Sequence, residues 1–171
     1  MEIRKSVLSD TAELTALFDE ARGTIALLGI DQWQDGYPSR EIVEEDIALN
    51  RSYAIVIDGQ VCGTFVLVDD GEPVYDKIYE GDWQTGEHSK DYVAIHRVAV
   101  SVKMRGKGIS TALIDYAKTY SLALGRSALR IDTHEGNVVM RRMLEKHGFE
   151  YCGVIYLENG EPRVAYEKII K

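Results

Sequence analysis

The chain of 171 residues contains only two cysteines, Cys62 and Cys152. Two cysteines cannot form the disulfide framework of a small secreted domain, and the chain has no C-x-x-C spacing that would indicate a metal or redox site. Both lie in short apolar, strand-like segments, so we expect them to be buried as small hydrophobic side chains. The sequence therefore indicates a fold that is held together by its hydrophobic core rather than by cross-links.

Long apolar runs are missing as well. The longest uncharged apolar stretch is Gln60–Val68, which is far shorter than the roughly 20 residues of a membrane-spanning helix. The first residues lack the apolar segment of a signal peptide. No repeat, low-complexity tract or linker rich in proline, glycine and serine divides the chain. We therefore expect one domain over residues 1–171, located in the reducing cytoplasm.

Basic residues are too few for a binder of nucleic acids or anionic membranes. The 20 Lys and Arg residues face 28 Asp and Glu residues, so the net charge is −8, and binding to such partners requires a basic surface. The charge is uneven, because residues 1–91 carry 20 acids and 7 bases whereas residues 92–171 carry 8 acids and 13 bases. This asymmetry indicates either two functional surfaces of opposite sign or an uneven solvated surface.

The hydrophobic pattern predicts a mixed fold of the α/β or α+β class. Two-residue turns of the Asp-Gly and Asn-Gly type, at Asp58 and Asn159, predict two hairpins. Strands are expected at residues 2–7, 52–57, 60–68, 92–100, 128–133, 151–157 and 163–169. Helices are expected at residues 10–28, 40–49, 108–124 and 138–147, with a polar, aromatic-dotted connection at 69–91.

The segment 103–110 lies between a predicted strand and a predicted helix. Gly106 and Gly108 allow backbone N–H groups to approach a ligand closely. A helix N-terminus favours anions, because its first N–H groups have no partner within the helix. Three cations strengthen that preference, namely Lys103, Arg105 and Lys107. The segment therefore predicts a site for a phosphate or pyrophosphate.

Two common phosphate motifs do not fit this segment. Gly108 follows Lys107 where a P-loop requires Ser or Thr, and Thr111 occupies the third glycine position of G-x-G-x-x-G. What remains is R-x-x-G-x-(G/A), with Ser110 in the last position, and it resembles the acyl-CoA pyrophosphate loop of the GNAT N-acetyltransferases. Asn137, followed after ten residues by Gly148-Phe149, is similar to a second element of that family. The alternative is a plain phosphate-binding α/β domain.

The resemblance implies a GNAT-like acyl-CoA N-acyltransferase fold, in which about four helices flank a mixed, mostly antiparallel central sheet. It implies acetyl-CoA as co-substrate, with the pantetheine arm pairing along the strand at 98–100 and the pyrophosphate held by the N–H groups of 105–110. The cofactor-binding residues that follow are Val98, Ala99, Val100, Arg105, Gly106, Lys107, Gly108, Ile109, Ser110 and Asn137. Arg141, Arg142 and Lys146 either reach the adenosine phosphates or form a solvated helix face.

The family's usual proton donor is missing. Many members carry a Tyr seven residues after the Asn, where this chain has Leu144. The thiol of CoA has an acidity near that of cysteine, with a pKa of about 8.5, so its thiolate leaves without full protonation. Tyr156 and Tyr151, on the following strand, are the candidate substitutes, and packing on the sheet face is the alternative for both.

An amine nucleophile must lose a proton before it attacks the thioester, because a lysine-like amine has a pKa of about 10.4. His96, two residues before Val98, is the candidate base, since imidazole titrates near neutral pH. Asp132 and His134 are its rivals at the end of the next strand. Each also has a structural interpretation as a packed or capping residue. The four histidines are scattered and form no zinc motif, so we predict no metal.

Two segments are candidates for the walls of an acceptor pocket. Trp33 and Tyr37 lie in the connection between the first two helices, where the family builds this pocket, and packing on the core is the alternative for them. Tyr75 and Trp83 lie in the connection 69–91, which carries eight acids and two lysines. Such a loop attracts a cationic acceptor, although solvated loop charge explains it as well.

These observations predict an N-acetyltransferase that moves an acetyl group from acetyl-CoA to a primary amine of a small molecule or peptide. Catalysis is expected to be direct attack in a ternary complex, without a covalent intermediate. The alternative is a non-catalytic acyl-CoA-binding sensor or interaction module on the same fold. A homodimer is a further expectation, since dimers are common in the resembling family.

Overall fold

The computed structural model describes residues 1–171 and contains seven strands, four α-helices and three short 3₁₀ turns. The strands are β1 (Glu2–Lys5), β2 (Ser52–Ile57), β3 (Gln60–Val68), β4 (Tyr92–Val100), β5 (Ala128–Thr133), β6 (Glu150–Tyr156) and β7 (Pro162–Ile169). The helices are α1 (Thr11–Ala26), α2 (Arg40–Ala48), α3 (Ile109–Ala123) and α4 (Val138–Lys146), and the turns are η1 (Leu8–Asp10), η2 (Pro73–Tyr75) and η3 (Val102–Met104).

The predicted elements all form, and β2, β3, β4 and β5 have the predicted bounds. The largest difference is at the N-terminus, where β1 ends at Lys5 and the turn η1 precedes α1. The N–H of Val7 donates to Asp10 Oδ2 at 2.8 Å, and Arg4 donates to the same carboxylate at 2.7 Å. Because these bonds turn the chain at Val7, the strand stops two residues earlier than the hydrophobic pattern indicates.

The chain divides into two compact units. The first comprises residues 1–67 and 97–113, and the second comprises residues 68–96 and 114–171. β4 and α3 each pass through both units, so neither unit is a continuous segment of sequence. The single domain expected over residues 1–171 stays a prediction.

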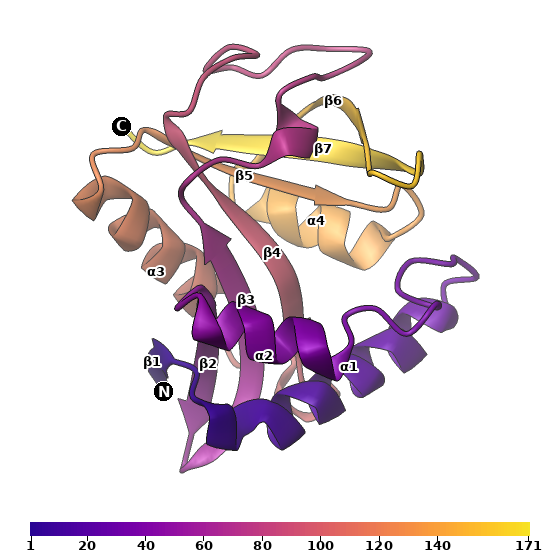
Figure 1. Ribbon diagram of the computed structural model, residues 1–171, viewed down its shortest axis with the longest axis vertical. Coiled ribbons are helices and arrows are strands. Elements are labelled where there is room, and N and C mark those ends of the chain that lie inside the picture. Colours follow the sequence, from indigo (N-terminus) through magenta and orange to yellow (C-terminus); the bar gives the residue numbers. More distant parts are fainter. The chain divides into compact units, whose positions relative to one another are not determined.

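The first unit contains the meander β1-β2-β3, in which both pairs are antiparallel. The N–H of Ser101 donates to the carbonyl of Cys62 at 2.9 Å, so the end of β4 lies beside β3. α1 and α2 run side by side (Figure 1). They bury an apolar cluster together with a β4 residue, and its members are Leu14, Leu17, Phe18, Val43, Ile47 and Ala99.

The second unit contains a four-stranded arrangement in the order β4-β5-β7-β6. β4 is parallel to β5, whereas β5-β7 and β7-β6 are antiparallel. A bridge between Tyr79 and Val154 continues the pairing beyond β6. α4 lies along β5 and β7 (Figure 1), where Arg141 donates to the hydroxyl of Tyr166 on β7 at 3.0 Å. The predicted class, a mixed and mostly antiparallel sheet with four helices, is confirmed.

The second unit also contains a buried ion pair that the sequence pattern does not reveal. Arg130 on β5 and Glu167 on β7 are both fully buried, with 2.8 Å between Nε and Oε1. The guanidinium lies 4.0 Å from the ring centroid of Trp83 and 4.1 Å from that of Tyr92. It also donates to Thr85 Oγ1 at 2.8 Å. The connection 69–91 is therefore fastened to the sheet rather than lying loose over it.

Two further expectations concern the whole chain. Cys62 and Cys152 are free and buried, as predicted. None of the helices has the length and apolar character needed to cross a membrane.

Candidate active site

The loop 105–110 joins the turn η3 to α3 in the first unit. Gly106 and Gly108 both have a φ of +77°, a conformation that glycine adopts without strain. A Cβ at either position would meet no atom within 4 Å, so open space surrounds both. The N–H of Ala112 donates to the carbonyl of Gly108 at 3.0 Å, so Gly108 directly precedes the first turn of α3. The loop thus adjoins the positive end of the α3 dipole, an arrangement that fits a pyrophosphate.

The loop carries exposed positive charge, and hydrogen bonds hold the turn that precedes it. Three exposed cations surround it, namely Lys103, Arg105 and Lys107. Glu20 on α1 accepts a hydrogen bond from the N–H of Val102 at 2.6 Å and another from Ser101 Oγ at 3.3 Å. The turn before the loop is therefore held against α1, while the cations stay accessible to a ligand.

Arg97 precedes the predicted pantetheine strand and has a φ of +49°, which interrupts the regular extended backbone of β4. Its guanidinium forms two 2.6 Å hydrogen bonds with the Asp46 carboxylate on α2, and a third with the hydroxyl of Tyr37. Burial lowers the pKa of Arg97, but Tyr37 and Asp46 outweigh burial and raise it above its ordinary value. Sequence reasoning missed Arg97, because its partners lie 51 and 60 residues away.

Trp33 and Tyr37 are half-buried in the connection between α1 and α2. The Trp33 ring packs edge-on against Phe18 with 5.8 Å between centroids, and Tyr37 lies 6.3 Å from Trp33. Arg22 on α1 fastens the connection by donating to the carbonyl of Tyr37 at 3.1 Å. Trp33 thus packs on the apolar cluster. Both rings are partly exposed, and the Arg22 hydrogen bond holds the backbone that carries them.

In the second unit, the pairing of β4 with β5 covers only Tyr92–Ala94 against Ala128–Arg130. His96 and Asp132 both lie beyond the last pair on their strands. Such an unpaired stretch between two parallel strands leaves backbone groups available to a strand-like ligand. Two of the three predicted catalytic side chains thus lie where the two strands stop pairing.

His96 is accompanied by an acid that sequence reasoning did not single out. Its Nε2 lies 2.9 Å from Glu72 Oε2, and the two side chains are 16% and 22% exposed. Nε2 is itself buried and makes no hydrogen bond of good geometry. The imidazole and the carboxylate are therefore within ion-pair distance, but an N–H on Nε2 would not point at Oε2. The ring also packs against that of Tyr75 with 5.8 Å between centroids.

Tyr75 and Trp83 lie in the interior, with 0% and 3% exposure. Their burial does not support the prediction that they line an acceptor pocket, because burying aromatic surface in the core is the larger gain for both. Instead, the hydroxyl of Tyr75 donates to Asp132 Oδ1 at 2.6 Å. Burial, followed by the charge of Asp132, holds the pKa of Tyr75 well above its ordinary value. Tyr75 is therefore a neutral donor that fixes the Asp132 carboxylate.

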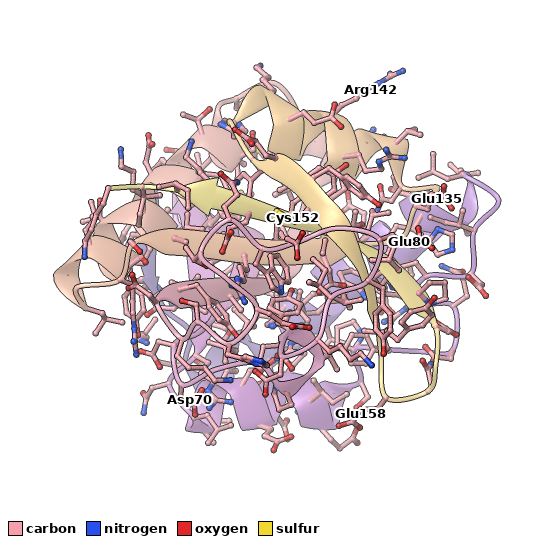
Figure 2. All side chains as sticks on the ribbon, turned by 90° about the horizontal axis from the view of Figure 1, so that it is seen from above. Asp70, Glu80, Glu135, Arg142, Cys152 and Glu158 are labelled. Atoms are coloured by element: carbon pink, nitrogen blue, oxygen red, sulfur yellow. The ribbon has the colours of Figure 1, made fainter.

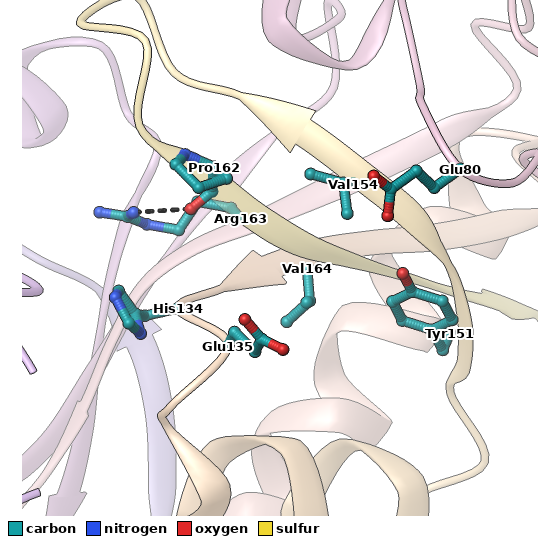
Figure 3. Close-up of a pocket in the computed structure, with 8 residues that line it drawn as sticks. All are labelled: Glu80, His134, Glu135, Tyr151, Val154, Pro162, Arg163 and Val164. Atoms are coloured by element: carbon teal, nitrogen blue, oxygen red, sulfur yellow. Dashed lines mark hydrogen bonds between the residues drawn. The ribbon is translucent and has the colours of Figure 1, made fainter.

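His134 lines a cavity of about 190 Å³ on the second unit. Its Nδ1 accepts from the N–H of Gly136 at 2.9 Å. The other lining residues, drawn in Figure 3, are Glu80, Glu135, Tyr151, Val154, Pro162, Arg163 and Val164. Burial raises the pKa of Tyr151, and the charges of Glu80 and Glu135 contribute to that shift.

The remaining proton-donor candidates differ in accessibility. Leu144 is fully buried, so an apolar side chain fills the position of the family's usual Tyr. Tyr156 is 44% exposed and meets the ring of Tyr79 edge-on, with 5.0 Å between centroids. Tyr151 is 50% exposed. Neither tyrosine is a core residue, so both hydroxyls remain candidates.

Asn137 is the N-cap of α4, because its Oδ1 accepts from the N–H of Met140 at 3.2 Å. Arg141 binds Tyr166 and the carbonyl of Glu135, so it serves the structure of this unit. Arg142 is exposed and projects away from α4 (Figure 2), as a side chain of a solvated helix face does.

Comparisons with known proteins agree on one family. A model of the acetyltransferase (GNAT) family matches residues 13–149. A crystal structure of a GNAT-family acetyltransferase from Streptococcus agalactiae is 37% identical and covers 99% of this chain and 95% of that chain, with a TM-score of 0.84. Another from Listeria monocytogenes is 22% identical over 98% of this chain and 94% of that chain, with a TM-score of 0.72, and shows the likeness of fold.

A curated relative is similar over a shorter segment. Streptothricin acetyltransferase from Escherichia coli is 31% identical over 78 residues, which is 45% of this chain and 45% of that protein. The matched segment thus spans less than half of either protein.

Proposed function

Because the chain belongs to the acetyltransferase (GNAT) family, whose name states acetyl transfer, we propose that it acetylates a primary amine of a cationic small molecule or peptide, with acetyl-CoA as donor. The observation that carries the proposal is the loop 105–110, where two left-handed glycines in open space adjoin the N-terminus of α3. This arrangement supports an anion site of the size and charge that the pyrophosphate of acetyl-CoA requires.

Acetyl-CoA offers two groups that the first unit could bind, namely the anionic pyrophosphate and the amides of the pantetheine arm. Backbone N–H groups of the loop 105–110 would bind the pyrophosphate oxygens, and the nearby lysines would add charge. The N–H groups of Arg105 and Lys107 donate to the carbonyls of Val102 and Met104 at 3.3 Å, so they would have to exchange these bonds for the ligand. The backbone of Val98, Ala99 and Val100 would pair with the amides of the pantetheine arm, as an added strand does. In the second unit, Asn137 would donate from its amide Nδ2 to the same arm, since its Oδ1 already caps α4.

The proposed reaction is a direct acyl transfer. The acceptor ammonium loses one proton, and the neutral amine nitrogen attacks the thioester carbonyl carbon to form a tetrahedral intermediate. The C–S bond then breaks, the nitrogen loses its second proton, and the CoA thiolate is protonated. His96 and Asp132 are the proposed groups for handling the amine's protons, and Tyr156 is the proposed donor to the thiolate. No covalent enzyme intermediate is required.

The negative charge of the second unit supports a cationic acceptor. Glu72 and Asp132 lie beside the end of the β4-β5 pairing, and Glu80 and Glu135 line the cavity that contains His134. Glu72 and Asp132 are only partly exposed, so they attract an ammonium group more strongly than the exposed Glu80 and Glu135 do, because the local dielectric constant is below that of water. In the first unit, the half-buried Trp33 and Tyr37 are the proposed acceptor contacts. The expected homodimer stays a prediction.

The function is tested by thiol release from acetyl-CoA over a panel of primary amines. We propose polyamines, amino sugars, lysine-containing peptides and streptothricin as its members, each with a neutral polyol as the matched control. Release is expected with at least one cationic amine and with no polyol. Calorimetric binding of acetyl-CoA without turnover on any amine would favour the non-catalytic acyl-CoA-binding module instead.

Replacing Asn137 with aspartate is expected to separate its two roles. Aspartate is as good an N-cap as asparagine, so α4 keeps its cap, although the charge at a position that is 6% exposed lowers the thermal unfolding midpoint. The amide donor is lost and a negative charge replaces it, so we expect acetyl-CoA to bind roughly tenfold or more weakly, as the loss of a hydrogen bond of about 1.5 kcal/mol predicts. Calorimetric titration with acetyl-CoA measures the second effect, and unchanged affinity would remove Asn137 from the pantetheine contacts.

A further inference from the structure

The segment that carries Glu72 is fixed to the sheet of the second unit at three points. The N–H of Glu72 donates to the hydroxyl of Tyr92 on β4 at 3.0 Å. Glu72 is the N-cap of η2, whose last residue, Tyr75, donates to Asp132 on β5 at 2.6 Å. The indole N–H of Trp83 donates to the carbonyl of Tyr75 at 3.0 Å. The position of the Glu72 carboxylate is thus set by the fold.

This anchoring places Glu72 against the buried nitrogen of His96. Nε2 of His96 is covered, while the Glu72 side chain keeps 22% of its surface exposed only 2.9 Å away. Glu72 thus places a partly exposed carboxylate next to a buried imidazole nitrogen. Further titratable groups near His96 in this unit are Tyr75, which packs on its ring, and Asp132, which accepts from Tyr75.

We propose that Glu72 and His96 work as one proton-accepting dyad, with Glu72 as the member that meets the acceptor ammonium. This inference rests on the proposed amine acetylation. The Glu72 carboxylate takes one proton from the ammonium, and the proton is shared with His96 Nε2. The neutral amine then attacks the thioester carbon, the C–S bond breaks, and the second proton of the nitrogen balances the protonation of the CoA thiolate. The dyad returns the first proton to water after the CoA thiol has left. Tyr75 is a positioning residue, because it supports the His96 ring and holds Asp132.

Glu72 is one of the acids that the connection 69–91 carries, and its backbone is fixed to the sheet. One proton added to a carboxylate and a neutral imidazole leaves the pair with no net charge. Placing the carboxylate on the outer side also draws a cationic acceptor to the point where its proton is removed. Glu72 supplies the exposed surface that an ammonium group can reach, and His96 supplies the buried nitrogen that accepts the proton.

The experiment compares Glu72→Gln, His96→Gln and the double variant in the full chain. Asp82→Asn is the matched control, because Asp82 lies exposed in the same connection and the substitution removes the same charge. The acceptor is the fastest amine of the panel, and 2,2,2-trifluoroethylamine, which is largely unprotonated at neutral pH, is the second acceptor. Each single variant is expected to lose roughly 100-fold in kcat/KM at pH 7 with the protonated amine, as removal of general-base catalysis predicts.

Three outcomes distinguish the dyad from a structural role. The double variant should lose no more than about threefold beyond either single variant, because residues that act as a unit are not additive. Trifluoroethylamine should be acetylated by Glu72→Gln within about fivefold of wild type, since it needs no base before attack. Asp82→Asn should behave as wild type. Equal losses of Glu72→Gln with both amines, or additive losses in the double variant, would overturn the dyad.

A spectroscopic readout is independent of turnover. Sharing a proton requires the His96 ring to turn its Nε2–H toward the Glu72 carboxylate, 2.9 Å away. In that state wild type and Asp82→Asn should give a downfield, slowly exchanging imidazole N–H resonance. It should be absent from Glu72→Gln and His96→Gln. Its absence from wild type would contradict the dyad even if acetylation is observed, whereas its presence without acetylation of any amine would leave the dyad intact and refute the proposed function.

Discussion

Gly108→Asp should weaken acetyl-CoA binding by about 100-fold or more. Position 108 has a φ of +77°, and the new side chain would point into the open space beside the N-terminus of α3. Its carboxylate would stand where the pyrophosphate is proposed to bind, and like charges about 4 Å apart repel by several kcal/mol at the effective dielectric constant of a protein surface. Calorimetric titration with acetyl-CoA and with CoA measures the loss.

Two controls separate charge from backbone strain in this experiment. Gly108→Asn introduces a side chain of the same size as aspartate but adds no charge. Asparagine tolerates the left-handed backbone at this position, so we expect acetyl-CoA to bind at most roughly tenfold more weakly than to wild type. Gly160→Asp adds the same charge at a turn glycine with a φ of +86° and open space around it, and should bind acetyl-CoA as wild type does. Wild-type affinity in Gly108→Asp would refute the anion site.

Arg130→Met should be the most destabilising of the substitutions discussed. Arg130 and Glu167 are fully buried, and the substitution leaves the Glu167 carboxylate with hydrogen bonds from Thr85 but without its counter-charge. Removing one partner of a buried pair costs about 3–5 kcal/mol. The contacts of the guanidinium with the Trp83 and Tyr92 rings are lost at the same time. Urea-induced unfolding measures the change in the free energy of unfolding.

A second variant and a surface control make this result specific. Arg130→Met combined with Glu167→Leu removes both charges, so it should be more stable than Arg130→Met alone, because no uncompensated charge stays buried. Arg40→Met breaks an exposed pair with Glu44 on α2 and should change stability by at most about 0.5 kcal/mol. Equal unfolding midpoints for Arg130→Met and wild type would contradict the role of the pair.

Much of the secondary structure followed from the local pattern. The Asp58-Gly59 turn set the bounds of β2 and β3, and Asn137 capped α4 as its side chain predicts. The loop 105–110 was recognisable for the same reason, because glycines, cations and a helix start within six residues make an anion site by backbone geometry alone. The family match over residues 13–149 includes this loop, and its role as an anion site stays a proposal.

What the sequence could not provide is the set of contacts between distant residues. Tyr75 and Trp83 were expected at a pocket wall from their loop composition, but burial drew both rings into the interior. Arg97 and Arg130 each look like an ordinary charge within a strand, and only the tertiary structure pairs them with Asp46 and Glu167.

The scarcity of cysteines, basic residues and long apolar runs determined the class of this protein: a mixed α/β fold without cross-links and with a net charge of −8, in which an anion site is proposed for the more basic half. Only the tertiary structure decided which acid accompanies His96. Glu72 lies 24 residues earlier in an irregular segment, and no periodicity relates the two positions. Their 2.9 Å contact exists because Tyr92, Tyr75 and Trp83 hold that segment against the sheet, and such long-range packing leaves no local signature in a sequence.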